Sequence, residues 1–442
     1  MQFTNLNFMF RFLPAFFIIY LIFPPKYRNK VLFAGSIVFI AIGDLKYTPL
    51  LLLFITVSFF SAIAISNLRR KESLSRTVFV ATVIFFSAVL LYFKYVSPNM
   101  PLGISFYTFT CISYISDIYM GNITIEKSFI NLGAYISCFP KLISGPIALY
   151  SDMRAKKRRI YPEYLEEGMS IFIIGLAYKV IIADHLAVLF NDCKIIGFES
   201  LPTALAWLCA YGFSMQLYFD FQGYSLMAIG IGKMLGFNLP KNFDHPYRSR
   251  SVSEFYRRWH MTLGTWFKKY LYIPLGGNRK GISHTVFNLF VVWIVTGMWH
   301  GATMNFVLWG FVLFLFIAAE KLGLKNILYK HLLLSKIYIY IVMPVTWVIF
   351  AVSNTTDMIS WLSSMFFMPS DTAVDTHIFF TYIKTYWMFF AAGAIVSLPF
   401  FEKICFKLKG RMIFKLLLLA VMLLCVYDMA GQSGSPFLYF KF

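Results

Sequence analysis

Residues 284–319 read HTVFNLFVVWIVTGMWHGATMNFVLWGFVLFLFIAA and contain no Lys, Arg, Asp or Glu. The stretch consists of two apolar runs, 284–299 and 302–319, which flank His300. Runs of this kind recur along the whole chain, near 12–23, 31–43, 49–66, 77–96, 102–120, 128–149, 169–190, 201–221, 224–237, 337–352, 377–400 and 412–430. Since about 20 apolar residues form one spanning helix, the pattern predicts an all-α polytopic membrane protein with about eleven to thirteen buried helices.

The composition excludes a soluble enzyme. Of the 442 residues 59% are hydrophobic and only 14% are charged, whereas soluble proteins carry about 25% charged residues. Residues 1–23 have no charged leader region and no small-residue cleavage site, so we interpret them as a retained first helix rather than a signal peptide. Because there is no internal repeat and no low-complexity linker, we expect residues 1–431 to form a single membrane domain, followed by a tail at 432–442.

The formal charge of +20 lies mainly in short loops between apolar runs. This distribution is typical of the positive-inside bias of membrane proteins and does not indicate nucleic-acid binding. The basic clusters at 26–30, 69–71, 154–159 and 403–411 are therefore expected on the cytoplasmic side. The last cluster directly precedes the run 412–430, which places the C-terminal tail on the outer face.

Several kinds of chemistry have no residues to support them. The six cysteines are scattered singly, without a CxxC pair or a Cys/His spacing that would suggest disulfides or a metal site. The chain also contains no HExxH, GxSxG, P-loop or GxGxxG pattern. Metal-dependent, hydrolase, ATPase and dehydrogenase functions are therefore not indicated.

Residues 238–281 form a basic stretch with interleaved aromatic residues, including Arg248, Arg250, Arg257 and Arg258. One interpretation is an interfacial loop anchored on lipid headgroups. The other is a docking surface for an anionic cytosolic ligand such as coenzyme A, whose phosphates suit clustered arginines.

Two histidines have unusual surroundings. His260 follows Arg257-Arg258-Trp259, and His300 stands in TGMWHGA at the end of an apolar run. A buried histidine is more often structural, but the glycines beside His300 allow a substrate to approach closely, and imidazole can accept a proton from a hydroxyl near neutral pH. Asp220 and Asp184 could line a substrate path, although a structural role is favoured for both.

Seven motifs occur in order along the chain. They are PLGISFYTF (101–109), FPKLISGP (139–146), YFDFQGYS (218–225), NFDHPY (242–247), RRWH (257–260), YIPLGGNR (272–279) and WHG (299–301). Together they resemble the membrane-bound O-acyltransferase (MBOAT) family, and within it the branch of the alginate O-acetyltransferase membrane subunit. The similarity weakens after about Leu324, so it does not identify the acceptor.

The resemblance implies a shell of tilted helices around a thin centre, with a cytosolic funnel and an outer funnel that meet at the catalytic histidine. It implies that His300 is this histidine and that His260 is the family's second characteristic histidine. No tightly bound cofactor is implied, and acetyl-CoA is the expected donor substrate. The expected location is the bacterial cytoplasmic membrane, the expected final acceptor a surface glycan, and the expected partner an extracytoplasmic SGNH-type acetyltransferase.

The tail ends in FLYFKF, residues 437–442. Tyrosine and phenylalanine favour the headgroup level of a bilayer, so an interfacial anchor is one interpretation. The tail also resembles the ending of a small membrane peptide in teichoic acid modification, where a tyrosine acts as a relay. We therefore expect Tyr439 to fold into the outer funnel and to carry the acyl group as an ester of its phenol. Such an ester is more reactive than an alkyl ester, because the phenolate is a good leaving group.

Three alternatives remain from the sequence. The same family includes D-alanyl transfer proteins of teichoic acid modification, which take their group from a carrier-protein thioester. A transporter of lipid-linked sugars also has many helices and buried charges, but it would show two similar halves with broken helices, and no such similarity is visible. A scaffold of a polysaccharide export complex would tolerate the loss of His300.

Overall fold

The computed structural model describes residues 2–154, 158–367 and 377–431, and these residues form helices and loops without any strand. The C-terminal tail with Tyr439 lies outside the described residues. The chain divides into two compact units. Unit 1 comprises Met1–Ile174 and Tyr224–Lys241, and unit 2 comprises Gly175–Gly223 and Asn242–Phe442. Each unit is considered by itself.

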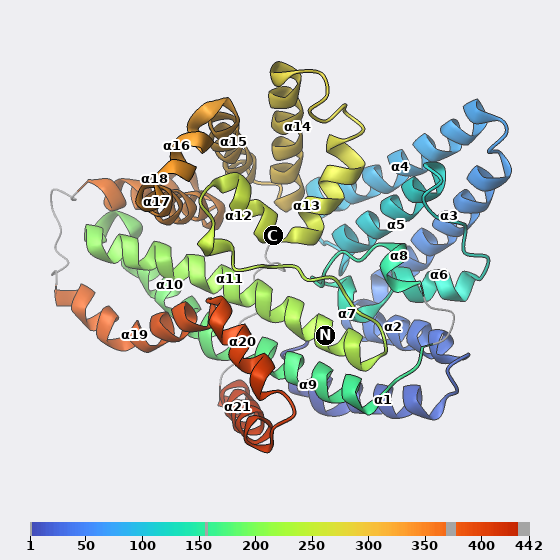
Figure 1. The fold of residues 1–442 in the computed structure, drawn as a ribbon, viewed down its shortest axis with the longest axis horizontal. Helices are drawn as coiled ribbons and strands as arrows, with labels where there is room; N and C mark the ends of the chain where they lie inside the picture. Colours follow the sequence, from blue (N-terminus) through green and yellow to red (C-terminus); the bar gives the residue numbers. More distant parts are fainter. Residues whose placement is uncertain (1, 155–157, 368–376, 432–442) are drawn as a thin grey trace. The chain divides into compact units, whose positions relative to one another are not determined.

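Unit 1 is built mainly from the N-terminal helices. They are α1 (Leu13–Ile22), α2 (Arg28–Asp44), α3 (Thr48–Asn67), α4 (Glu72–Tyr95), α5 (Ile104–Tyr119), α6 (Phe129–Ile136), α7 (Phe139–Leu142), α8 (Tyr150–Met153) and most of α9 (Pro162–Ala177). The helices α3, α4 and α5 pack against one another (Figure 1). All residues of α5 except Tyr119 are buried, and two of its hydroxyl groups donate to the backbone of the preceding turn, from Thr110 Oγ1 to Phe106 O and from Ser113 Oγ to Thr110 O, each at 2.9 Å. This pairing removes the cost of burying a polar side chain.

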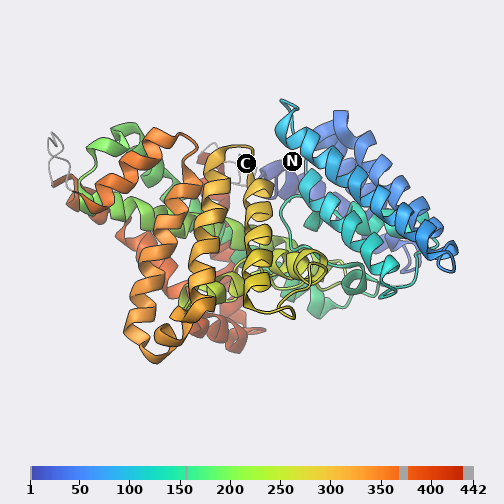
Figure 2. The same ribbon diagram turned by 90° about the horizontal axis from the view of Figure 1, so that it is seen from above.

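Unit 2 contains the remaining helices. They are α10 (Asp184–Ile196), most of α11 (Thr203–Met234), α12 (Val252–Arg258), α13 (Met261–Phe267), α14 (Ile282–His300), α15 (Met304–Ala319), α16 (Lys325–Lys330), α17 (Leu332–Ala351), α18 (Thr355–Phe366), α19 (His377–Val396), α20 (Pro399–Leu408) and α21 (Met412–Gly431). A π-helical segment, Tyr178–Ala183, joins α9 to α10. The helix α15 packs between α14 and α17 (Figure 2). These three helices and the short pair α12–α13 position the candidate site.

The described part of the chain has eight helical segments that are long and apolar enough to cross a membrane. They are Arg28–Asn67, Glu72–Tyr95, Pro162–Ile196, Ile282–His300, Met304–Lys330, Leu332–Ala351, His377–Val396 and Met412–Gly431. The all-α, multi-pass prediction is thus confirmed, with fewer spanning segments than the eleven to thirteen helices expected.

Several apolar runs do not give a separate candidate span. The runs 31–43 and 49–66 lie in one segment, Arg28–Asn67, and the run 12–23 gives only the short helix α1. The runs 201–221 and 224–237 form one helix, α11, because Gly223 continues the helix rather than ending it. A Cβ atom on Gly223 would lie 2.6 Å from Gly175 O, so this glycine permits close approach of a neighbouring backbone. The run 102–120 gives the short helix α5, and the run 128–149 is divided into α6 and α7 with a turn before Pro140.

A buried ion cluster joins the π-helical segment, α10 and α11 within unit 2. Lys179 Nζ lies 2.6 Å from Asp184 Oδ1 and 2.7 Å from Asp220 Oδ1, and the side chains of Lys179 and Asp220 are 4% and 2% exposed. In a low-dielectric interior a charge is tolerated only when it is paired. This geometry agrees with the structural role favoured for both aspartates.

We expect Lys179→Met to destabilise the protein, because it removes the cation shared by the buried Asp220 and the partly exposed Asp184. Removal of one partner of a buried ion pair typically costs about 3–5 kcal/mol. The thermal midpoint in detergent should therefore fall clearly. The matched control is Lys179→Met combined with Asp184→Asn and Asp220→Asn, which removes all three charges and should recover part of the loss. If the single variant has the same thermal midpoint as the wild-type protein, the ion cluster contributes little to stability.

Candidate active site

The short helix α12 is fixed at its N-terminus by two side chains. The Ser251 hydroxyl caps the helix by accepting a hydrogen bond from Glu254 N at 3.1 Å. Glu320, at the end of α15, is 2% exposed, and its carboxylate accepts bonds from Val252 N at 2.6 Å and Ser253 N at 2.9 Å. A carboxylate at a helix N-terminus satisfies backbone donors that have no partner within the helix. These contacts hold α12, and with it the Trp259–His260 turn, against α15.

The turn between α12 and α13 has an unusual backbone at His260. This residue has φ +45° and ψ +52°, in the left-handed region that residues other than glycine rarely adopt. Asn242 holds the turn from both sides, since its backbone carbonyl accepts a bond from Met261 N at 2.8 Å and its side chain contacts His260 and Thr262. Strained residues held by their surroundings are concentrated at functional sites.

The contacts of Asn242 define the proton position on His260. Asn242 Oδ1 lies 3.3 Å from Thr262 N, 2.9 Å from Thr262 Oγ1 and 3.1 Å from His260 Nδ1. Because a backbone N–H can only donate, this Asn242 atom is an acceptor, and His260 Nδ1 therefore carries the proton. His260 Nε2 is left with a lone pair, and it is buried without a hydrogen-bond partner among the described residues.

His260 is only 3% exposed, and its ring meets the edge of Phe221 at a centroid distance of 4.6 Å. Burial lowers the pKa of His260 from 6.5 to about 3, because the imidazolium form loses its hydration. His260 is therefore a neutral imidazole at physiological pH, with Nε2 as an acceptor.

His300 is the last residue of α14 and is 7% exposed. Its position against α15 depends on small residues. A Cβ atom on Gly297 would collide with Phe306 O, and one on Gly301 would collide with the Phe306 ring. Glycine at these positions allows α14 and α15 to approach closely, as in many membrane helix pairs.

Aromatic side chains surround the His300 ring. The centroid distances are 4.7 Å to Trp299, 5.0 Å to Trp309 and 5.2 Å to Phe350, and the rings of Trp309 and Phe350 meet it nearly at right angles. Such an apolar surrounding excludes water and strengthens electrostatic interactions within it.

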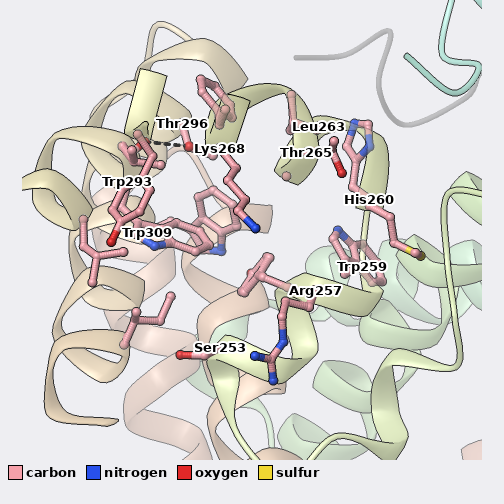
Figure 3. A pocket seen from close by; sticks show the side chains of 18 of the residues that line it. Ser253, Arg257, Trp259, His260, Leu263, Thr265, Lys268, Trp293, Thr296 and Trp309 are labelled. Carbon is pink, nitrogen blue, oxygen red and sulfur yellow. Dashed lines mark hydrogen bonds between the residues drawn. The ribbon is translucent and has the colours of Figure 1, made fainter. Parts of the chain in front are cut away.

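His260 and His300 line the same cavity, which has a volume of about 550 Å³. This size lies in the range of small-molecule sites, about 300–1,000 Å³. Figure 3 shows His260 and Thr265 on one side of the cavity and Trp293 and Trp309 on the other, with Lys268 and Arg257 extending between them. The two histidines singled out by the family resemblance therefore line one cavity, while their roles stay predictions.

The cavity is also lined by four cations, Arg257, Lys268, Lys321 and Lys325. The one carboxylate among its described lining residues is Glu320, which is engaged by the start of α12 and by Tyr338 Oη at 3.1 Å. The lining therefore has an excess of positive charge, which suits an anionic ligand. Among the described residues no group of three or more His, Cys, Asp or Glu side chains is arranged to hold a metal ion.

The four arginines expected at a donor site are placed differently from one another. Only Arg257 lines the cavity. Arg258 Nη1 lies 2.8 Å from Asp244 Oδ2 and its Nε lies 3.1 Å from Glu254 Oε1, so this guanidinium is engaged in ion pairs. Arg248 and Arg250 are exposed and do not line the cavity.

Sequence reasoning missed Trp309, Lys321 and Lys325, whereas Lys268 lies in the basic stretch 238–281. Trp309 Nε1 is buried without a hydrogen-bond partner among the described residues, although buried indole N–H groups usually have one. Lys321 and Lys325 are four residues apart, but Gly323 between them has φ +138° and interrupts the helix. Their spacing therefore does not place them on one helix face, and the sequence offered no local signal for the two lysines.

Spanning helices around a buried, histidine-lined cavity define a multi-pass membrane enzyme. Residues 125–363 match the model of MBOAT, the membrane-bound O-acyltransferase family. The chain belongs to this family and is an acyltransferase.

Three relatives show how far the similarity extends. The chain is 37% identical over 367 residues to a probable alginate O-acetylase AlgI of Pseudomonas fluorescens, covering 80% of this chain and 73% of that protein. It is 31% identical over 414 residues to a peptidoglycan O-acetyltransferase of Helicobacter pylori, covering 81% and 78%. It is 28% identical over 269 residues to a teichoic acid D-alanyltransferase of Bacillus subtilis, covering 54% and 67%.

We predict that His260 makes stability depend on pH. Below pH 6.5 the unfolded chain binds a proton at this imidazole, whereas the folded chain does not until about pH 3. The stabilising contribution is thus fully present above pH 6.5 and is lost as the pH falls toward 3, by about 1.4 kcal/mol per pH unit. Between pH 7 and pH 5 the wild-type protein should lose about 2 kcal/mol more than His260→Gln in thermal unfolding. Equal losses in both proteins would contradict the buried neutral state.

Proposed function

We propose that this protein transfers an acetyl group from a cytosolic thioester, acetyl-CoA, toward a surface glycan on the outer side of the bacterial cytoplasmic membrane. The observation that carries the proposal is the cavity that both His260 and His300 line, with cations in its lining and aromatic side chains around His300. A thioester of an anionic carrier requires a cationic surface for its phosphates and a dry site for its acyl group.

In the proposed reaction His300 is the general base. It accepts the proton of the attacking hydroxyl, whose oxygen forms a bond to the thioester carbonyl carbon. The carbon–sulfur bond then breaks, and the thiolate leaves and takes up a proton. The Trp309 indole N–H is suited to donate to the carbonyl oxygen as negative charge develops there, because it is a buried donor beside His300.

His260 is proposed as a positioning residue. Its Nδ1–H is engaged by Asn242, and its Nε2 lone pair is available to accept a bond from a hydroxyl group within the cavity. A neutral imidazole accepts such a bond without adding a charge to the site.

The comparisons support acetyl as the transferred group. The two O-acetyl-transferring relatives match 80–81% of the chain, whereas the D-alanyltransferase of B. subtilis matches 54%. We therefore favour acetyl over D-alanyl transfer. The transporter and scaffold alternatives are set aside, since the chain belongs to an acyltransferase family.

Tyr439, outside the described residues, is the proposed relay. In this scheme His300 takes the phenol proton, the phenolate receives the acetyl group, and the resulting aryl ester passes it to an extracytoplasmic SGNH-type partner that modifies the glycan. The scheme requires the tail, residues 432–442, to lie on the outer face, as the basic cluster at 403–411 suggests.

Labelled acetyl-CoA tests both roles in one experiment. We expect His300→Ala to lower the rate of acetyl transfer by about 10²–10⁴-fold, the usual contribution of a general base, while the protein still inserts into the membrane. Tyr439→Phe keeps the aromatic tail but should abolish the labelled C-terminal peptide in mass spectrometry. The measurements are glycan acetylation in cells and label on the purified chain.

The two variants have separate outcomes. Near wild-type acetylation by His300→Ala would contradict the role of the base. Normal acetylation by Tyr439→Phe would not affect the proposed role of His300 as general base, but it would show that Tyr439 is an interfacial anchor and not a relay. A carrier protein loaded with labelled D-alanine, offered in place of acetyl-CoA, should give no labelled product. Transfer of its label would favour the D-alanyl-transferring branch of the family.

The cations of the cavity lead to a kinetic prediction. We expect the double variant Arg257→Glu/Lys268→Glu to raise KM for acetyl-CoA roughly 10-fold, with a smaller change in kcat, because it removes charge from the donor surface. The matched control is Arg248→Glu/Arg250→Glu, which makes the same charge change at exposed arginines outside the cavity. Equal effects of the two double variants would mean that only the overall charge of the protein matters.

A further inference from the structure

A second cavity lies in unit 1 and plays no part in the proposed reaction. Its volume is about 800 Å³, and it is formed by the end of α3, the first turn of α4, the end of α5 with the loop that follows, and the end of α8. Three cations line it, namely Arg69, Lys127 and Arg154. None of its described lining residues is an aspartate or a glutamate. The cavity therefore presents positive charge alone.

The three cations are available to a ligand. Each is exposed, and none forms an ion pair with a carboxylate among the residues that the structure describes. The nearest acidic residue in sequence, Glu126, is engaged elsewhere: its carboxylate accepts from Ser128 N at 2.9 Å and from Tyr150 Oη at 2.6 Å. The amide of Asn67 adds a neutral donor to the same lining, whereas Asn122 Nδ2 donates to Asp117 Oδ1 at 3.0 Å and Ser151 Oγ donates to Asp152 Oδ1 at 3.4 Å.

Arg69 is seated in the cavity by a glycine. Gly121 has φ +76°, in the left-handed region, and a Cβ atom there would collide with Arg69 Nη2. The glycine thus serves both the turn after α5 and the close approach of the guanidinium. A planar guanidinium beside two further cations suits the oxygens of a phosphate group.

The place of the cavity in the fold indicates where the phosphate comes from. The candidate span Arg28–Asn67 ends at this cavity and the candidate span Glu72–Tyr95 begins there. The ends of spanning helices lie at the level of lipid headgroups, and the clusters at 69–71 and 154–159 are those that the charge bias assigns to the cytoplasmic side. Basic pockets at this level bind anionic lipid headgroups.

We propose that this cavity is a phosphate-binding site occupied by the headgroup of an anionic phospholipid of the cytoplasmic leaflet. Arg69, Lys127 and Arg154 contact the phosphate oxygens, and the Asn67 amide contacts the rest of the headgroup. The site is independent of acyl transfer, since none of its residues lines the cavity of His300.

The test uses the purified full chain in nanodiscs and in detergent. Thermal midpoints are measured in nanodiscs of phosphatidylcholine alone and with added phosphatidylglycerol or cardiolipin. Binding of the same lipids is measured by native mass spectrometry, and inorganic phosphate is titrated in detergent. We expect the anionic lipids to bind and to raise the midpoint, because a ligand that binds only the folded state stabilises it.

Variants of the lining residues test whether anionic lipid binds in this cavity. Arg69→Gln and Arg154→Gln should each weaken binding of anionic lipid about 5-fold, and the double variant roughly 30-fold. Arg70→Gln is the matched control, because it removes the same charge from the next, exposed residue, which does not line the cavity. If the double variant is poorly folded in phosphatidylcholine, Lys127→Gln on the exposed loop replaces it.

Each outcome decides the proposal. The site is supported if Arg69→Gln, Arg154→Gln or Lys127→Gln weakens binding of anionic lipid while Arg70→Gln binds it as the wild-type protein does. Binding of inorganic phosphate as tight as that of the lipid, lost in the same variants, keeps the phosphate site but overturns its lipid source. Equal weakening by Arg70→Gln, or no preference of the wild-type protein for anionic lipid or phosphate, overturns the proposal.

Discussion

The candidate site depends on one side-chain oxygen. Asn242 Oδ1 accepts from Thr262 N, Thr262 Oγ1 and His260 Nδ1, so a single amide fixes the backbone of a strained turn and the tautomer of the histidine within it. Buried polar groups without water must find partners in the protein, and an amide oxygen that accepts three bonds has no acceptor capacity left. Were this oxygen lost, the turn with φ +45° at His260 would keep only its backbone bonds, such as that from Met261 N to the Asn242 carbonyl.

The apolar runs predicted the spanning helices best where a run is bounded by polar residues or turns. The runs 284–299, 302–319 and 412–430 agree closely with α14, α15 and α21. Hydropathy alone did not predict α11 as one helix, because the apolar runs 201–221 and 224–237 are interrupted at Gln222-Gly223, where Gly223 faces the Gly175 carbonyl inside a continuous helix. A glycine that breaks a helix in isolation is tolerated where two backbones pack closely, and that context is tertiary.

The two histidines of the site were predictable from their surroundings in the sequence, whereas the cationic lining was only partly so. Arg257 and Arg258 are neighbours with the same charge, yet one lines the cavity and the other pairs with Asp244 and Glu254. Adjacent residues of a helix point about 100° apart, so a charge cluster does not define a common surface. Lys321 and Lys325 reach the cavity because α15 starts beside His300 and runs back along α14, so that the residues after it lie near the start of α14, which no local pattern indicates.

The walls of the histidine cavity are built largely from indole and phenyl rings, with Trp259, Trp293, Trp309, Trp347 and Phe350 among them. A tryptophan has only two side-chain torsions, and these rings are packed against one another, so they lose little conformational entropy when a ligand enters. Lysine and arginine on the same cavity have several torsions each and must be ordered by the ligand. In the proposed reaction the acyl end of the donor therefore meets a rigid, shape-selective surface, and its charged end meets an adaptable one.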